Sequence, residues 1–235
     1  EYTENYSKML QSIKQYGGFY IGKYEVGSFD KPVNSNDNTR KAVIQQGAFP
    51  YNYVTCSQAE DLSEGLVTGD KTSTLMFGIQ WDLVLKYLEV NEDWDTEIND
   101  ASYYLKIDSS SWGNYRDIEF SVEQGNKYAI FSNWLLGGWN DVPQHYSKPI
   151  YTSDDSGVLL TTGATKRNSK MNIYDLAGNL FEWTLEKSNR TNSYSLCVDR
   201  GGSLNASGLS FQAASRNVFS ISGNDGNLGF RPTLY

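Results

Sequence analysis

Few residues of this chain have side chains and spacing suited to covalent or metal chemistry. There are two cysteines, Cys56 and Cys197, and one histidine, His145, in 235 residues. A metal centre of nitrogen and sulfur ligands needs several of them, so one imidazole cannot build it. A serine hydrolase triad would depend entirely on His145, and no nucleophile-elbow motif is present. Aspartates and glutamates are numerous but form no recognisable paired motif. The sequence therefore predicts a protein without a catalytic site.

The two cysteines have two interpretations. They could bridge, but two cysteines in a chain of this length do not make a disulfide framework. Cysteine is also among the residue types most often buried in cores. We favour two buried free thiols and leave their pairing open.

The composition limits fold and partners. Aromatic residues make up 14% and charged residues 20% of the chain, and 21 glycines are present, which is typical of a loop-rich fold containing β-structure. A net charge of −8 argues against nucleic acid as a partner, because phosphate binding needs a basic face. No run approaches the roughly 18 apolar residues of a membrane span, so we expect no membrane insertion. No linker or repeat is visible, and we expect one domain over residues 1–235.

The first half of the chain contains predicted helices and one clear strand. Residues 3–16 have apolar side chains at helical spacing, and residues 19–26 alternate as a strand does. A further helix has two possible capping boxes at its start, Thr55 with Gln58 or Ser57 with Glu60. The next helix carries its apolar stripe on Trp81, Val84, Leu85 and Leu88. Residues 89–170 are polar, aromatic and without regular periodicity.

The stretch 172–184 organises the second half. Ala177, Gly178 and Asn179 form a predicted tight turn, at which Gly178 supplies a positive φ, and a half-buried strand follows. Arg-Gly-Gly-Ser at 200–203 and Gly-Phe-Arg-Pro at 229–232 come after it. Together these three motifs resemble the C-terminal half of the formylglycine-generating-enzyme (sulfatase-modifying factor) family, and the strand at 19–26 is similar to an early strand of that family.

The resemblance implies an α+β fold that is C-type-lectin-like, with a mixed, irregular sheet and two flanking helices. It also implies that strands near the two termini pair. The family's catalytic cysteines follow the Arg-Gly-Gly-Ser motif, whereas residues 201–235 contain no cysteine and Cys197 precedes the motif. The family's sulfoxide-synthase branch uses a histidine cluster, and this chain has only His145. We therefore expect no enzyme activity, and an enzyme of this family is the alternative.

The family also holds a structural calcium near the organising turn. The matching positions are the side chains of Asp175 and Glu182 and the carbonyl groups of Gly178 and Leu180. Oxygen ligands of this kind suit calcium. The alternative is a turn whose aspartate caps its own backbone, and no other cofactor is required.

The C-terminal region, residues 200–235, has an unusual composition. From Gly201 onward, sixteen of thirty-five residues are Gly, Ser or Asn. This region resembles the variable region of proteins diversified by a retroelement, in which reverse transcription randomises adenines and so changes Asn codons. That resemblance implies a ligand-binding protein whose C-terminal region varies, while Arg200, Arg216 and Arg231 are structural. An undiversified lectin-like binding domain is a further alternative.

The resemblance implies that two runs, 204–212 and 218–227, form the ligand face, with their side chains exposed. We expect ligand contacts from Leu204, Asn205, Ser207, Leu209, Ser210, Phe211, Gln212, Val218, Phe219, Ser220, Ser222, Asn224, Asp225 and Asn227. The expected partner is a protein or glycan on a target cell or particle surface. The expected location is a phage virion tail or a bacterial cell surface.

Overall fold

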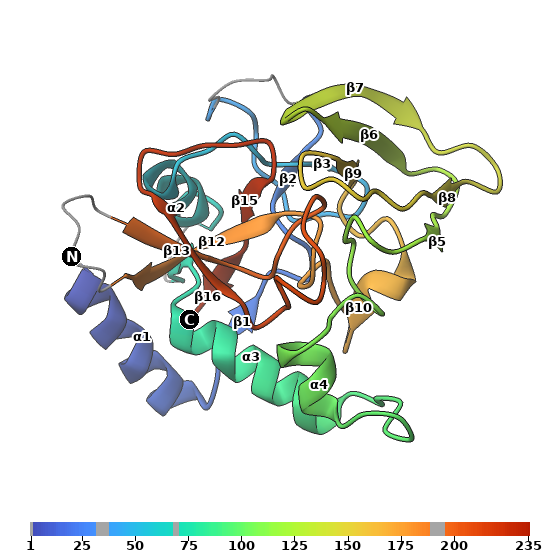
Figure 1. Cartoon of the computed structure of the whole chain (residues 1–235). Helices are drawn as coiled ribbons and strands as arrows, with labels where there is room; N and C mark the ends of the chain where they lie inside the picture. Colours follow the sequence, from blue (N-terminus) through green and yellow to red (C-terminus); the bar gives the residue numbers. More distant parts are fainter. Residues whose placement is uncertain (1, 32–37, 68–70, 189–195) are drawn as a thin grey trace.

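The computed structural model describes residues 2–31, 38–67, 71–188 and 196–235 (Figure 1). Short strands and long connections dominate it, and the helices lie around a central sheet. The helices are α1 (Tyr2–Tyr16), α2 (Cys56–Glu64), α3 (Gly78–Asn91), α4 (Ala101–Lys106) and the 3-10 helix η1 (Lys166–Asn168).

The central sheet has the strand order β14-β13-β12-β15. Its members are β12 (Phe181–Lys187), β13 (Leu196–Arg200), β14 (Arg216–Ser220) and β15 (Leu228–Phe230). Strand β15 runs parallel to β12, while β13 runs antiparallel to both β12 and β14. The organising stretch thus supplies the strand at the middle of this sheet, and the C-terminal region supplies strands on both sides of it.

A second sheet joins the two ends of the chain. Strand β16 (Pro232–Leu234) lies between β1 (Tyr20–Ile21) and β4 (Ser73–Leu75), with Ile21 opposite Thr233. This antiparallel pairing confirms the expectation that strands near the termini pair.

The middle of the chain contains strands that its sequence pattern did not indicate. A three-stranded sheet has the order β7 (Leu135–Asp141), β6 (Lys127–Ser132) and β9 (Gly157–Leu160). Three two-stranded pairs complete the sheets: β2 (Gly27–Ser28) with β3 (Phe49–Pro50), β5 (Phe120–Ser121) with β8 (Ser147–Lys148), and β10 (Ser169–Lys170) with β11 (Ile173–Tyr174).

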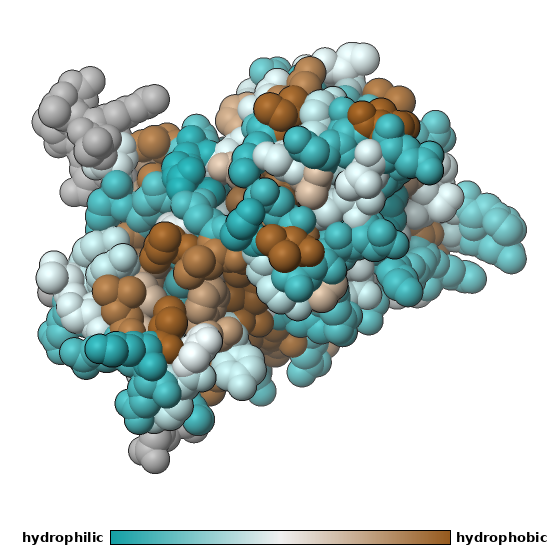
Figure 2. Space-filling model, turned by 90° about the horizontal axis from the view of Figure 1, so that it is seen from below, coloured by the Kyte–Doolittle hydropathy of each residue, from teal (hydrophilic) through white to brown (hydrophobic). Residues whose placement is uncertain are grey.

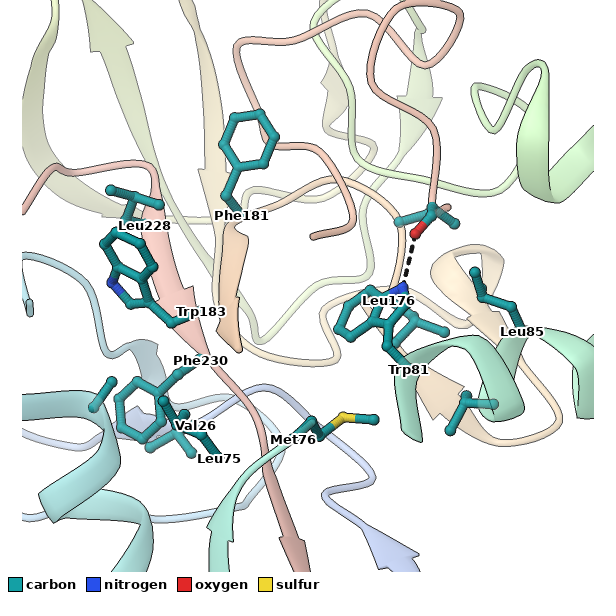
Figure 3. Packing of buried hydrophobic residues seen from close by; sticks show 14 of the residues in the cluster. Val26, Leu75, Met76, Trp81, Leu85, Leu176, Phe181, Trp183, Leu228 and Phe230 are labelled. Atoms are coloured by element: carbon teal, nitrogen blue, oxygen red, sulfur yellow. Dashed lines mark hydrogen bonds between the residues drawn. The ribbon is translucent and has the colours of Figure 1, made fainter. Parts of the chain in front are cut away.

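Two helices pack on β12, as the resemblance implied. Of the two possible capping boxes, the structure uses Thr55 with Gln58, since each side chain bonds the backbone N–H of the other residue. Helix α3 buries its predicted apolar stripe. Trp81 of this helix donates from its indole nitrogen to the carbonyl of Ala213 at 2.9 Å, which ties α3 to the C-terminal region (Figure 3).

A buried lysine fixes the loop that precedes β5. Lys148 is fully buried, and its ammonium group donates to the carbonyl oxygens of Tyr115 and Ile118 at 2.7 Å and of Pro149 at 3.2 Å. Burial lowers the pKa of Lys148 to about 7, because a charged amine is poorly solvated there. Trp112 and Tyr115 of the same loop are also buried, so the loop packs against the core through several side chains.

The main core lies between the central sheet, α2 and α3. Trp183 on β12 and Phe230 on β15 are fully buried and stand in register on neighbouring strands (Figure 3). The indole of Trp183 also donates to the carbonyl of Val54 at 3.0 Å. The side chain of Trp183 therefore combines a large buried apolar area with a satisfied polar group, as buried indoles require.

Replacing Trp183 by alanine should lower the free energy of unfolding by about 3–5 kcal/mol, since it opens a cavity and leaves the Val54 carbonyl unpaired. Urea denaturation followed by circular dichroism measures this difference. Tyr16→Ala is the matched control, because that ring is 75% exposed, and it should change the unfolding free energy by less than about 0.5 kcal/mol. Equal losses in the two variants would contradict this packing.

Candidate ligand-binding face

The first run of the C-terminal region begins inside the protein. Leu204 is fully buried and Asn205 is 6% exposed. The Asn205 side-chain oxygen accepts from Ser203 at 2.7 Å and from Asn227 at 3.1 Å, and its amide nitrogen donates to the carbonyl of Asp154 at 2.7 Å. Asn227, at the end of the second run, is 9% exposed. Asn205 and Asn227 therefore hold the bases of the two runs together. The expectation that the side chains of Leu204, Asn205 and Asn227 are exposed was wrong.

The two aromatic anchors expected on the ligand face also point inward. Phe211 is half-buried, and its ring lies 5.4 Å from that of Phe181 at 83°. Phe219 is half-buried, with its ring 6.0 Å from that of Trp183. Both rings pack against the main core, which removes part of their apolar area from water. Their expected role as freely exposed anchors was wrong.

Four of the predicted contact residues are exposed: Leu209, Ser210, Ser222 and Asn224. Besides Phe211 and Phe219, five more are half-buried: Ser207, Gln212, Val218, Ser220 and Asp225. The exposed residues lie on two loop segments, which we call the first loop (207–212) and the second loop (221–225).

Each loop is held by contacts that leave its outer side chains free to change. In the first loop the Phe211 N–H donates to the carbonyl of Ser207 at 2.9 Å. A Cβ at Gly208 would lie 2.4 Å from the backbone nitrogen of Ser110, so only glycine fits there. The second loop is held where the Tyr53 N–H donates to the carbonyl of Asp225 at 3.0 Å. The backbone of each loop is thus fixed while Leu209 remains 58% exposed.

Two arginines and two carboxylates form a closed quartet beside β14. Arg200 is fully buried and bonds Asp82 at 2.9 Å and Glu186 at 3.1 Å. Arg216 bonds the second oxygen of each carboxylate, through Glu186 at 2.9 Å and through Asp82. The side chain of Arg216 is 46% exposed, as an outer member of the quartet. The structural role expected for Arg216 therefore rests on shared partners rather than on burial.

The third arginine lies under the organising turn. Both oxygens of Glu182 accept from Arg231, at 2.7 and 3.0 Å, and the pair is almost completely buried. Arg231 also donates to the carbonyls of Gly22 at 2.7 Å and Tyr174 at 2.8 Å. Gly178 has φ +72, as the turn requires, and packs directly against the backbone of Asn114.

The proposed calcium donors do not fit a cation in this arrangement. Both Glu182 oxygens are already bonded to Arg231, and Asp175 accepts from the Gly163 N–H at 2.7 Å rather than capping its own turn. Burial raises the pKa of Asp175 to about 7. In the described part of the chain, no group of three His, Cys, Asp or Glu side chains could hold a metal ion. The guanidinium of Arg231 supplies the positive charge at this position.

Two exposed apolar residues beside the C-terminal region were missed from the sequence. Trp134 is 54% and Leu135 is 65% exposed, at the turn between β6 and β7. The Trp134 N–H donates to the carbonyl of Asp155 at 3.4 Å, and Asn205 bonds the adjacent Asp154. Asn133 and Trp134 have φ of 51° and 63°, which defines a two-residue hairpin turn. The sequence indicates this turn only weakly, because a tryptophan is unusual at such a turn position.

A separate apolar surface lies between α3 and the segment that follows α1. Figure 2 shows it as a hollowed, largely apolar area on the underside of the molecule. The groove, of about 290 Å³, is lined by Gly18, Phe19, Ile21, Leu83, Val84, Tyr87 and Ile173.

None of the described helices is long and apolar enough to cross a bilayer.

The chain belongs to the family described as the sulfatase-modifying factor enzyme 1-like domain, whose model matches residues 8–233. Its fold is accordingly the α+β, C-type-lectin-like fold of the formylglycine-generating enzymes, as the three motifs implied. The cysteine pair expected after Arg-Gly-Gly-Ser is missing from this member, since residues 201–235 contain no cysteine.

Solved structures similar to this chain include the following two. Treponema denticola variable protein 1 matches at 15% identity and a TM-score of 0.45, over 92% of this chain and 84% of that one. CarF matches at 23% identity and a TM-score of 0.30, over 37% of this chain and 31% of CarF. The comparison with curated proteins gave no match.

The burial of the two phenylalanines and the exposure of Leu209 predict opposite responses to truncation. Leu209→Ser should change the free energy of unfolding by less than about 0.5 kcal/mol, as surface substitutions do. Phe219→Ser should lower it by about 1–3 kcal/mol, because the ring leaves Trp183. Thermal and urea denaturation of both variants measure the two changes. If Phe219→Ser leaves the free energy of unfolding unchanged, the ring of Phe219 does not pack on Trp183 and belongs to the exposed face.

A buried carboxyl group under β14 predicts an unusual pH dependence. Asp199 is fully buried, accepts from Asn217 at 3.3 Å, and has one oxygen without a hydrogen-bond partner. Burial raises its pKa to about 7. Its pKa in the unfolded chain is about 3.9, so between about pH 4 and pH 7 the carboxyl group of Asp199 takes up a proton when the chain folds. The contribution of Asp199 to stability is therefore fully present below about pH 4 and is lost as the pH rises to about 7.

Asp199→Asn should match the parent protein in stability near pH 4 and exceed it above about pH 7, by roughly 1–4 kcal/mol. Urea denaturation of both proteins across this pH range measures the difference. Asp93→Asn makes the same charge change at an exposed position and should leave the pH profile parallel to that of the parent. A pH-independent offset for Asp199→Asn would show that Asp199 is ionised in the folded protein.

Proposed function

We propose that this protein is a non-enzymatic binding protein whose C-terminal region is diversified by a retroelement, so that related copies bind different targets. The observation that carries the proposal is the division of labour within residues 200–235. The residues of the Arg-Gly-Gly-Ser and Gly-Phe-Arg-Pro motifs are buried, and Arg200 and Arg231 are bonded to the scaffold. Leu209, Ser210, Ser222 and Asn224, in contrast, are exposed on loops with fixed backbones. Such an arrangement lets side chains vary without entering the core.

The cysteines of this chain do not support the oxidase chemistry of the enzymes in this family. Copper-dependent oxidation by the family uses two cysteines after Arg-Gly-Gly-Ser, and here the two cysteines lie elsewhere in the chain. Cys56 and Cys197 are 2% and 0% exposed, so neither thiol faces a substrate. A binding role requires no such group.

The proposed target is a protein or glycan on the surface of a cell or particle, and the proposed location is a phage tail or a bacterial surface. Serine and asparagine side chains supply adaptable hydrogen bonds, and Leu209 adds apolar contact, as in antibody loops. Trp134 and Leu135 extend the exposed set at the hairpin turn held beside Asp155. Tryptophan is among the residues that contribute most to binding at interfaces.

Sequencing the DNA that flanks the gene tests diversification directly. We expect a near-copy of the final part of the coding sequence, differing mainly at adenines, beside a reverse-transcriptase gene. Copies of the gene from sister isolates should then differ at the codons of Leu209, Ser210, Ser222 and Asn224 and keep those of Leu204, Asn205 and Asn227. Uniform substitution along the whole gene, with no such template, would contradict diversification and leave an undiversified binding domain.

A further inference from the structure

The two cysteines of the chain, far apart in sequence, meet at the junction of α2 and the central sheet. Cys56 is the first residue of α2, and its sulfur lies 3.8 Å from the carbonyl oxygen of Thr184 on β12. The hydroxyl of Thr184 donates to the carbonyl of Val198 on β13 at 2.8 Å. Cys197 is the residue before Val198 and belongs to the same core cluster as Cys56. Cys56 therefore lies beside β12 and Cys197 lies on the neighbouring strand β13, and the two side chains interact directly.

The electrostatics of the two sulfur atoms agree with this placement. A hydrogen bond between the two thiols, together with burial, raises the pKa of Cys56. The same hydrogen bond lowers the pKa of Cys197, and nearby Lys187 acts in the same direction. Of the two thiols, Cys197 therefore has the greater thiolate character. A thiolate beside a thiol is the reactive arrangement for disulfide formation.

We propose that Cys56 and Cys197 form a redox-active dithiol site that closes to a disulfide linking α2 to the central sheet. The oxidant is a small disulfide such as oxidised glutathione. During folding, before the core closes over the two thiols, the Cys197 thiolate attacks one sulfur of the oxidant, breaking its sulfur–sulfur bond and releasing one glutathione thiolate. The Cys56 thiolate, after losing its proton, attacks Cys197 and releases the second glutathione thiolate. The protein loses two electrons and two protons, which the two glutathione thiols gain.

The cross-link would act on the scaffold that carries the loops, and it does not depend on the proposed binding function. Cys197 stands opposite Phe219 of β14, the strand between the two loops. A bond from β13 to α2 constrains the unfolded chain by closing a long loop. It should raise the thermal midpoint by roughly 5–15 °C in a chain of this size, without changing the pairing of β13 with β14.

Thiol counting in glutathione buffers tests the proposal. The full-length protein, reduced and unfolded, is refolded in buffers of increasing oxidised-to-reduced glutathione ratio, so that access to the buried thiols does not limit the reaction. It is then quenched with acid, unfolded and alkylated for intact mass spectrometry. We expect both thiols to disappear together, in a monomer lighter by two hydrogen atoms, with a Cys56–Cys197 peptide after digestion.

The single variants Cys56→Ser and Cys197→Ser are the matched controls. Each should keep one alkylatable thiol or carry one glutathione, and its thermal midpoint should not respond to the glutathione ratio as that of the parent does. Two thiols that stay alkylatable at the most oxidising ratio would overturn the proposal. So would glutathione adducts or intermolecular dimers as the only oxidised products. The thiol count of the parent protein decides the matter even where a variant fails to fold.

Discussion

The ion pair between Arg231 and Glu182 is the interaction on which the rest of this structure depends. Removing both charges from water is expensive, and the bidentate geometry with two added carbonyl acceptors offsets that cost. The partners come from four segments: the end of β15, strand β12, the residue after β1 and strand β11. One guanidinium therefore fixes the N-terminal strand, the organising turn and the C-terminal strand relative to one another.

The surroundings of this pair show how tightly its charge is balanced. Glu25 and Asp175 are also buried nearby, and burial together with neighbouring carboxylates raises the pKa of Glu25 well above its usual range. With one arginine among three carboxyl groups, protonation keeps the cluster close to neutral. The quartet of Arg200, Arg216, Asp82 and Glu186 reaches neutrality differently, by matching two cations with two anions. Both charge clusters therefore carry little net charge where they lie beneath the C-terminal region.

The parts of the fold that follow from local pattern could be predicted from the sequence. Helix α3 buries its stripe because spacing alone decides which side chains share a face. Strands β5 and β8 could not be predicted, since each is two residues long and they pair at a distance in sequence, with Lys148 opposite Phe120. The sequence also could not predict which side chains of the two C-terminal runs are exposed and which are buried. Composition says that Asn205 and Asn227 are polar, but only their mutual hydrogen bond explains why both are buried.

That hydrogen bond limits how much of the C-terminal region can vary. The two loops share a base through Asn205 and Asn227, while their outer residues Leu209 and Asn224 lie on separate segments with backbone contacts of their own. Substitutions at positions without shared partners act independently, so each loop can change its surface without disturbing the other. A change at the shared base would leave buried polar groups unpaired on both loops at once. The capacity for diversity therefore resides in the outer residues, and the fold is protected by the small number of asparagines and arginines beneath them.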